Sequence, residues 1–167
     1  PLDLISGHVD TGEPIPDALY ERMRAAKNFQ SAMQMVRQLE FAIFDFRLHL
    51  EYDPARGGRV YEILDQVRDQ VAVLKPPAFN RFAHGFSHIF SGGYAAGYYS
   101  YKWAEVLSAD AFSLFEEKGV LDTDTGRAFR QSILERGGSA EAMDLYVEFR
   151  GREPSIDALL RQTGIAA

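Results

Sequence analysis

Residues 29–50, FQSAMQMVRQLEFAIFDFRLHL, form the longest periodic segment of the chain. Apolar side chains recur there at intervals of three and four residues, which places them on one stripe of an α-helix: Phe29, Ala32, Val36, Leu39, Ile43, Phe46 and Leu50. Further apolar residues lie off this stripe, at Met33, Met35, Phe41 and Phe44. A helix that is apolar on several faces is usually enclosed by other structure. We therefore predict a long central helix around which other elements pack.

Helical signals continue on both sides of this segment. Residues 16–27 and 60–74 carry helical patterns, and the prolines after Lys75 end the second of them. More helical patterns occupy the last third of the chain, and no segment alternates like a strand with a hairpin turn. Residues 1–15 have no sustained periodicity and are expected to be an extended lead-in. The sequence predicts an all-α fold in which residues 1–167 form a single helical region.

Composition excludes several classes of function. The chain has 167 residues, of which 46% are hydrophobic and 25% charged, enough for one globular domain with a sizeable core. Its 18 basic and 24 acidic residues give a net charge of −6, so nucleic acid is not an expected partner. The absence of cysteine excludes disulfides, thiolate metal sites and a cysteine nucleophile, and it fits a reducing compartment. No apolar run approaches the roughly 20 residues that span a membrane.

Residues 79–103 concentrate bulky rings and glycines: Phe79, Phe82, Phe86, Phe90, Tyr94, Tyr98, Tyr99, Tyr101 and Trp103, with glycine at 85, 92, 93 and 97. If a helix begins near Tyr94, then Tyr94, Tyr98 and Tyr101 project their hydroxyls from one face. Such a face could bind a peptide backbone or a developing oxyanion. It could also be a half-buried stripe whose tips reach water, and spacing alone favours this second interpretation.

Two histidines lie in the same stretch, four residues apart. On one helix His84 and His88 would share a side, which is half of a zinc site by geometry. However, Gly85 stands where the metalloprotease signature has glutamate, and no third ligand is evident, so a metal site here is not favoured. His84 is expected to be a cap or a core histidine, whereas His88 could turn a second donor toward the tyrosines. His49, in the long helix, is expected to be a hydrogen-bonded structural histidine.

The run Phe86–Trp103, FSHIFSGGYAAGYYSYKW, resembles the C-terminal signature of the thimet oligopeptidase family of zinc metallopeptidases. Further segments resemble that family in the same order, namely LISGH at residues 4–8, KNFQ at 27–30, RQLEF at 37–41, FDFRLH at 44–49 and RGREP at 150–154. The resemblance implies a longer, mostly helical enzyme with zinc in a deep channel that admits short peptides. The family's zinc-binding His-Glu-x-x-His helix and later glutamate are not in this sequence. The chain is therefore expected to be the C-terminal part of such an enzyme, with the zinc ligands upstream of Pro1.

The resemblance also implies roles for individual residues. Tyr101 and His88 match residues that donate hydrogen bonds to the tetrahedral intermediate formed when zinc-bound water attacks the peptide. Tyr94 and Tyr98 match residues on or beside a loop that closes over the peptide, and the glycines that would let it move are Gly92, Gly93 and Gly97. No residue of this chain is expected to bind the zinc.

These roles imply a location and partners. The resemblance predicts a cytoplasmic enzyme that acts on short peptides, with this part inactive alone. Its other expected partner is the remainder of its own polypeptide, and apolar surface on the long helix could drive self-association. The alternative is a stand-alone helical module that binds peptides without cleaving them.

Overall fold

The computed structural model describes residues 2–166, and within this range every regular element is a helix and no strand is present. The predicted all-α fold is confirmed. The elements, in chain order, are α1 (Leu2–Ile5), α2 (Asp17–Lys27), α3 (Ser31–Leu50), η1 (Pro54–Arg56), α4 (Val60–Val71), α5 (Phe82–Gly85), η2 (Ser87–Ile89), α6 (Ser100–Lys118), α7 (Thr123–Phe129), η3 (Arg130–Leu134), α8 (Ala142–Arg150) and α9 (Asp157–Gln162).

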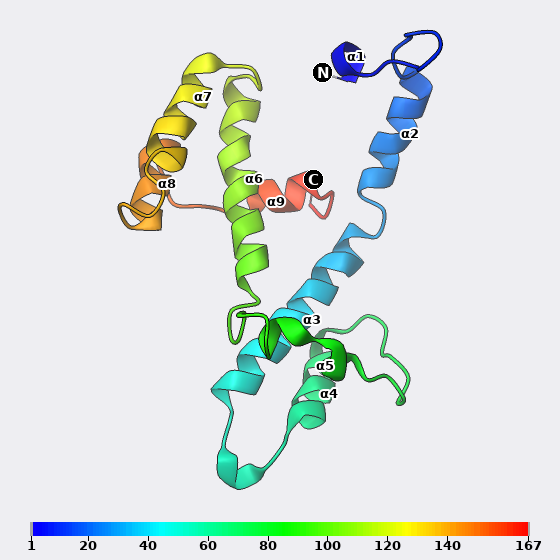
Figure 1. Cartoon of the computed structure of the whole chain (residues 1–167), viewed down its shortest axis with the longest axis vertical. Coiled ribbons are helices and arrows are strands. Elements are labelled where there is room, and N and C mark those ends of the chain that lie inside the picture. Colours follow the sequence, from blue (N-terminus) through cyan, green and yellow to red (C-terminus); the bar gives the residue numbers. More distant parts are fainter. Residues whose placement is uncertain (1, 167) are drawn as a thin grey trace.

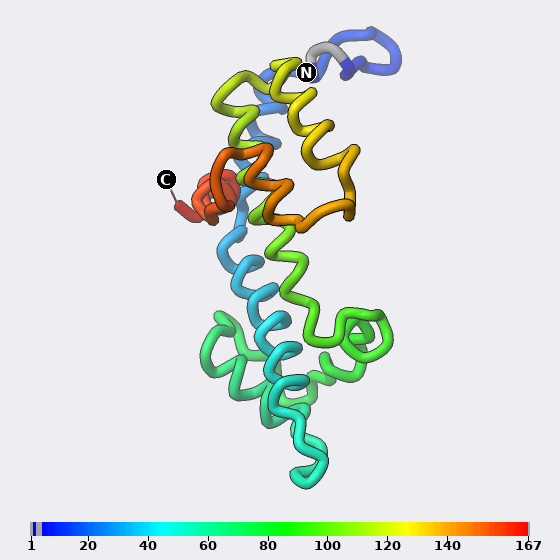
Figure 2. The backbone as a smooth tube through the Cα atoms, turned by 90° about the vertical axis from the view of Figure 1, so that its left-hand side faces the viewer, coloured from blue at the N-terminus to red at the C-terminus, as the bar shows by residue number. Residues whose placement is uncertain are grey.

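Two long helices, α3 and α6, organise the molecule (Figure 1). The chain descends through α2 and α3, turns back through α4 and α5, and then rises through α6, beside which α7, α8 and α9 pack. Seen from the side, α2 and α3 follow one another along the long axis (Figure 2). Helix α2 has no buried residue, so this helix contributes nothing to either core. None of the described helices is long and apolar enough to cross a membrane.

The first core lies where α3 packs on α4 and α5. Its buried members are Phe44, Ile63, Leu64, Val67, Ala83, Phe86 and Ile89. The ring of Phe41 stacks on Phe82 with centroids 4.7 Å apart. Beside this core, buried Glu40 on α3 accepts hydrogen bonds from Arg37 at 2.8 Å and from Arg68 of α4 at 3.0 Å. This core therefore fixes the start of the aromatic stretch against α3.

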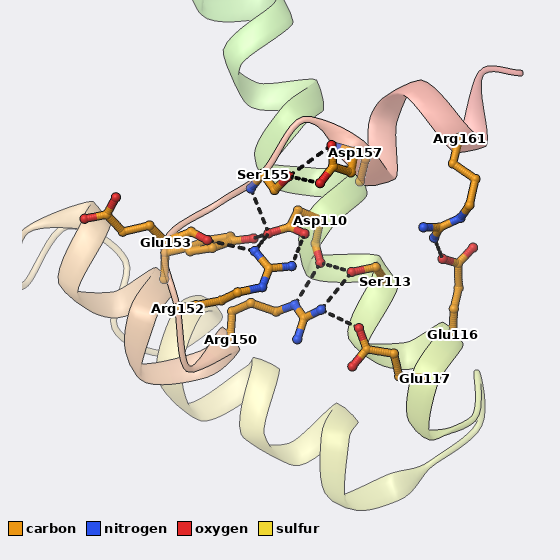
Figure 3. A network of polar contacts seen from close by, with 12 residues as sticks. Asp110, Ser113, Glu116, Glu117, Arg150, Arg152, Glu153, Ser155, Asp157 and Arg161 are labelled. Carbon is orange, nitrogen blue, oxygen red and sulfur yellow. Dashed lines mark hydrogen bonds and ion pairs between the residues drawn. The ribbon is translucent and has the colours of Figure 1, made fainter. Parts of the chain in front are cut away.

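The second core joins α6 to α9 through Val106, Ala109, Ala158 and Leu159. A polar network next to it centres on Asp110, which is 1% exposed (Figure 3). The Asp110 carboxylate accepts hydrogen bonds from both terminal nitrogens of Arg152, at 2.8 and 2.6 Å, and from the Tyr146 hydroxyl at 2.5 Å. Arg150 donates to the Asp110 carbonyl at 3.2 Å. The network ties α8 and the segment before α9 to the middle of α6.

The environment of α3 differs from the prediction of an enclosed central helix. Phe44, which lies off the main apolar stripe, is fully buried. Stripe residues are exposed instead, with Phe29 at 71%, Phe46 at 47% and Leu50 at 72% of their surface. The stripe is covered only in part, since Ile43 is half-buried against the first core and the ring of Phe46 meets that of Tyr99 edge-on at 6.4 Å.

Three boundaries also differ from the sequence-based expectations. The lead-in is helical at its start, because α1 occupies Leu2–Ile5, and residue 1 lies outside the described range. Helix α4 ends at Val71 rather than at residue 74. The helix expected from Tyr94 begins at Ser100, and residues 95–99 form turns instead.

Candidate functional site

The aromatic stretch folds into short helices and a tight reversal, and two glycines make that reversal possible. A Cβ atom on Gly92 would lie 2.8 Å from the His88 Cα atom and 2.9 Å from the His88 carbonyl oxygen, closer than real Cβ contacts. Gly93 has φ +82°, a left-handed conformation that side chains disfavour. As a result the chain turns back on itself, and the Tyr94 amide donates to the His88 carbonyl at 3.1 Å.

This reversal brings the predicted site residues together. The rings of Tyr94 and Tyr101 are 5.1 Å apart, and so are those of Tyr98 and Tyr101. The His88 ring lies 5.9 Å from Tyr98 and 6.2 Å from Tyr94. The predicted cause of the tyrosine grouping was wrong, because no common helix carries all three tyrosines. The turn at residues 94–99 gathers them instead. We call His88, Tyr94, Tyr98 and Tyr101 the tyrosine cluster.

The cluster is open to solvent on the side of Tyr101 and His88. Tyr101 is 40% exposed and His88 is also exposed, whereas Tyr94 and Tyr98 are half-buried. Side-chain hydrogen bonding with Tyr94, together with burial, raises the pKa of Tyr101 above its ordinary value of 10.0. Burial raises the pKa of Tyr98 in the same direction. Both phenols are therefore neutral hydrogen-bond donors at neutral pH.

Side chains of helix α3 form hydrogen bonds with the tyrosine cluster and with the turn that carries it. The Tyr98 hydroxyl donates to Gln38 Oε1 at 3.0 Å. The Asp45 carboxylate accepts the amides of Ala96 and Tyr98, each at 2.9 Å. His49 Nδ1 lies 2.9 Å from Asp45 Oδ1 and 2.8 Å from the Asp45 carbonyl oxygen, which confirms the expected structural histidine.

Asp45 and Gln38 were not singled out from the sequence. One signal was available for Asp45, since it is an acidic residue between two phenylalanines in an otherwise apolar helical run. Buried carboxylates need donors, so this position predicts a polar partner from elsewhere in the chain. Nothing in the sequence indicates that the partner is a backbone turn more than fifty residues later, at Ala96 and Tyr98.

His84 lies apart from the cluster. It is exposed, and its ring meets Tyr61 edge-on at 5.7 Å, so it is neither a core histidine nor a neighbour of His88 on one helix. The chain bends at Phe86, between α5 and η2. Across residues 2–166 no three His, Asp or Glu side chains are grouped so as to hold a metal ion. The described residues therefore do not fit a zinc site.

The sequence was then compared with known proteins, and residues 1–165 match peptidase family M3. The chain belongs to this family. It is 57% identical over 164 residues to "Oligopeptidase A" of Escherichia coli and 56% identical over 164 residues to the protein of that name in Salmonella typhimurium. It is also 48% identical over 167 residues to "Probable cytosolic oligopeptidase A" of Arabidopsis thaliana.

The alignments cover nearly all of this chain but only a small part of each relative. Each of the three alignments includes 98% of this chain but only 24% of the relative. The chain thus spans about a quarter of the length of the curated relatives it matches. The resemblance inferred from the aromatic stretch is confirmed at the level of the family.

Proposed function

We propose that this chain is the substrate-binding and transition-state-stabilising C-terminal part of a zinc metalloendopeptidase that hydrolyses short peptides. Membership of peptidase family M3 and the relatives named oligopeptidase A support a peptidase. The observation that carries the proposal is the tyrosine cluster, in which the exposed Tyr101 phenol and the exposed His88 imidazole both neighbour the ring of Tyr98.

In this proposal Tyr101 and His88 are the catalytic donors. The carbonyl oxygen of a peptide gains negative charge when a nucleophile attacks its carbon, and donors already in position stabilise that charge. Tyr101 carries its proton at neutral pH, as any phenol with an ordinary pKa of 10.0 does, and the hydrogen bond with Tyr94 raises this pKa further. Loss of one such donor typically lowers the rate by about 10² to 10³.

The other cluster residues bind the peptide. Tyr94 presents a half-buried ring stacked on that of Tyr101, and the half-buried ring of Tyr98 meets Tyr101 edge-on. Gly92, Gly93 and Gly97 form the backbone beside them. Without side chains, these glycines let a peptide approach the backbone and let the loop adjust around it.

In this proposal, zinc is bound by residues that do not belong to this chain. Because the chain spans only 24% of the length of its relatives, the zinc ligands are proposed to lie in a part of the parent protein that this chain does not include. The chain alone is therefore proposed to be inactive, and the remainder of its polypeptide is its first partner. We propose a cytoplasmic location for the parent. Among plant relatives one is named cytosolic, and another, 47% identical, is named organellar, so the family name alone does not decide location.

The test is a cleavage assay with a quenched fluorescent peptide, with and without a zinc chelator. The proposal predicts that a longer parent protein containing this chain cleaves the peptide in a chelator-sensitive way and that the 167-residue chain with added zinc does not. Efficient chelator-sensitive cleavage by the chain alone would contradict the missing-ligand part of the proposal. If the protein encoded by the longest natural reading frame binds peptides without cleaving them, the alternative of a stand-alone binding module is favoured instead.

A further inference from the structure

Asp45 of α3 is a fully buried carboxylate whose two oxygens face the turn before α6. Oδ1 accepts the Ala96 amide and Oδ2 accepts the Tyr98 amide, each at 2.9 Å. These two amides flank Gly97, so one carboxylate holds both sides of the glycine. Hydrogen bonds to an ionised carboxylate are among the stronger ones in proteins, and burial shields this pair from water.

The turn held by Asp45 is strained. Ala96 has φ +54°, a left-handed conformation that residues with a Cβ atom rarely adopt. Such a conformation persists only where surrounding contacts impose it. The hydrogen bond from the Ala96 amide to Asp45 is such a contact, and His49 Nδ1 hydrogen-bonds the Asp45 carbonyl oxygen at 2.8 Å and lies 2.9 Å from Oδ1.

A second contact from α3 reaches the side chain of the same turn. Gln38 lies seven residues before Asp45, about two helical turns, and so on the same face of α3. Its Oε1 atom accepts the Tyr98 hydroxyl at 3.0 Å. Tyr98 is therefore bound at its amide by Asp45 and at its hydroxyl by Gln38. Between these points its ring faces His88 at 5.9 Å and Tyr101 at 5.1 Å.

We propose that Asp45 and Gln38 are positioning residues, and that Tyr98 is the strut through which they set the places of His88 and Tyr101. The phenolic proton of Tyr98 is used by Gln38, so the Tyr98 hydroxyl does not donate to a bound peptide. Asp45 is fully buried and touches no substrate. The catalytic consequence rests on the proposed function, whereas the immobilisation of the turn does not.

The first experiment measures amide hydrogen exchange by NMR in the chain itself. Asp45→Asn replaces one acceptor oxygen with a donor, so at least one of the Ala96 and Tyr98 amides loses its partner. We expect these amides to exchange about ten to a hundred times faster, while amides in the middle of α4 keep their protection. The matched control is Asp65→Asn, which changes the same charge at an exposed position of α4. Unchanged exchange at both residues 96 and 98 in a folded Asp45→Asn chain would overturn the proposal.

The second experiment uses the parent enzyme and does not depend on a substitution in the buried core. We expect Gln38→Leu and Tyr98→Phe each to lower kcat about tenfold, with KM changed less than about twofold, and the double variant to be no worse than either single one. Gln38→Glu keeps an oxygen acceptor for the Tyr98 hydroxyl and should restore most of kcat. If Gln38 and Tyr98 had a purely structural role, the variants would change the melting temperature without lowering kcat selectively over KM.

The opposite kinetic pattern would overturn the proposal that Tyr98 is a strut. If Tyr98→Phe raises KM several-fold while Gln38→Leu changes neither constant, the Tyr98 hydroxyl donates to substrate. If the parent protein cleaves no peptide at all, the proposed function fails. The strut is then decided by exchange at the Tyr98 amide in Gln38→Leu and Tyr98→Phe, which the proposal expects to accelerate in both.

Discussion

The ring of Tyr94 stacks on the ring of Tyr101, with centroids 5.1 Å apart and planes 29° from parallel. Tyr94 precedes the turn and Tyr101 lies in the first turn of α6, so the stacking closes the reversal that also brings in His88. The same pair explains why the Tyr101 pKa is raised, since the Tyr94 hydroxyl interacts with that of Tyr101.

Tyr94→Phe should lower the pKa of Tyr101 toward its ordinary value of 10.0, because the largest cause of the upward shift is removed. NMR titration of ring-labelled tyrosine measures this directly. Tyr52→Phe is the matched control, since Tyr52 is 73% exposed and lies outside the cluster. An identical Tyr101 titration curve in Tyr94→Phe and the unmodified chain would contradict the pairing.

Asp110→Asn should destabilise the chain by about 2 kcal/mol at neutral pH. Removing one partner of a buried ion pair costs about 3–5 kcal/mol, and the lower figure applies because the Arg152 side chain is 43% exposed and can turn to solvent. Chemical denaturation measures the change. The control is Asp124→Asn, whose side chain is 83% exposed and whose pair with Arg127 should contribute less than about 0.5 kcal/mol.

The Asp110 effect should also depend on pH. Burial opposes ionisation of Asp110, but hydrogen bonds from Arg152, Tyr146 and the Ser155 amide outweigh it and hold its pKa below 3.8. A lowered folded-state pKa stabilises the fold above the unfolded value and loses that contribution as pH falls through the folded value. The difference between the unmodified chain and Asp110→Asn should thus be constant from pH 7 to about pH 5 and shrink below 3.8. A difference that grows in acid would contradict this assignment.

The three loop glycines should respond differently to alanine. Gly92→Ala collides with the His88 backbone and should cost about 1–3 kcal/mol, and Gly93→Ala imposes a left-handed residue at about 1–2 kcal/mol. At Gly97 the added Cβ would meet the Tyr94 carbonyl oxygen at 3.5 Å, an ordinary contact, so stability should change by less than about 0.5 kcal/mol. Thermal unfolding measures all three, with Gly85→Ala as the control because its Cβ meets open space.

Because Gly97→Ala should leave stability nearly unchanged, its effect on activity tests whether the loop must move. If the loop must move during turnover, this variant lowers peptidase activity of the parent while leaving its melting temperature unchanged. Full activity in Gly97→Ala would show that Gly97 is not a hinge.

The chain should self-associate through exposed apolar side chains of α3 and of the segment just before it. Phe29 and Leu50 are 71% and 72% exposed, and burying such side chains against a second copy is favourable by about 25 cal/mol per Å². Sedimentation velocity at increasing concentration should show oligomers, and the Phe29→Ser, Leu50→Ser double variant should reduce them. Leu121→Ser, at a site 87% exposed between α6 and α7, should not. A monomer at all concentrations would contradict the prediction.

Local patterns predicted the helices well, because three-four periodicity and proline or glycine stops act within a few residues. The start of α6 was missed for a non-local reason. Residues 94–99 carry helix-compatible spacing, but Ala96 is left-handed, its amide is bonded to Asp45 more than fifty residues earlier, and α6 begins only at Ser100. Nothing within the segment itself reports that contact.

In the candidate site, too, local sequence patterns were informative and non-local contacts were not predicted. The aromatic run and the family resemblance pointed to Tyr101, Tyr98, Tyr94 and His88, and the structure gathers their rings into one cluster. Their common location arises from a backbone reversal rather than from helical spacing. On α3, periodicity placed the apolar residues and exposed apolar surface was expected, but which of them are buried, as Phe44 is, depends on where α4 and α5 pack.

The central claim is that Tyr101 stabilises the transition state of peptide cleavage. The most direct measurement is kcat and KM of Tyr101→Phe in the full-length parent enzyme, with Tyr52→Phe beside it as an exposed control. We expect kcat to fall by about 10² to 10³ and KM to change less than about threefold, since only a transition-state contact is removed. A near-normal kcat in Tyr101→Phe would contradict it.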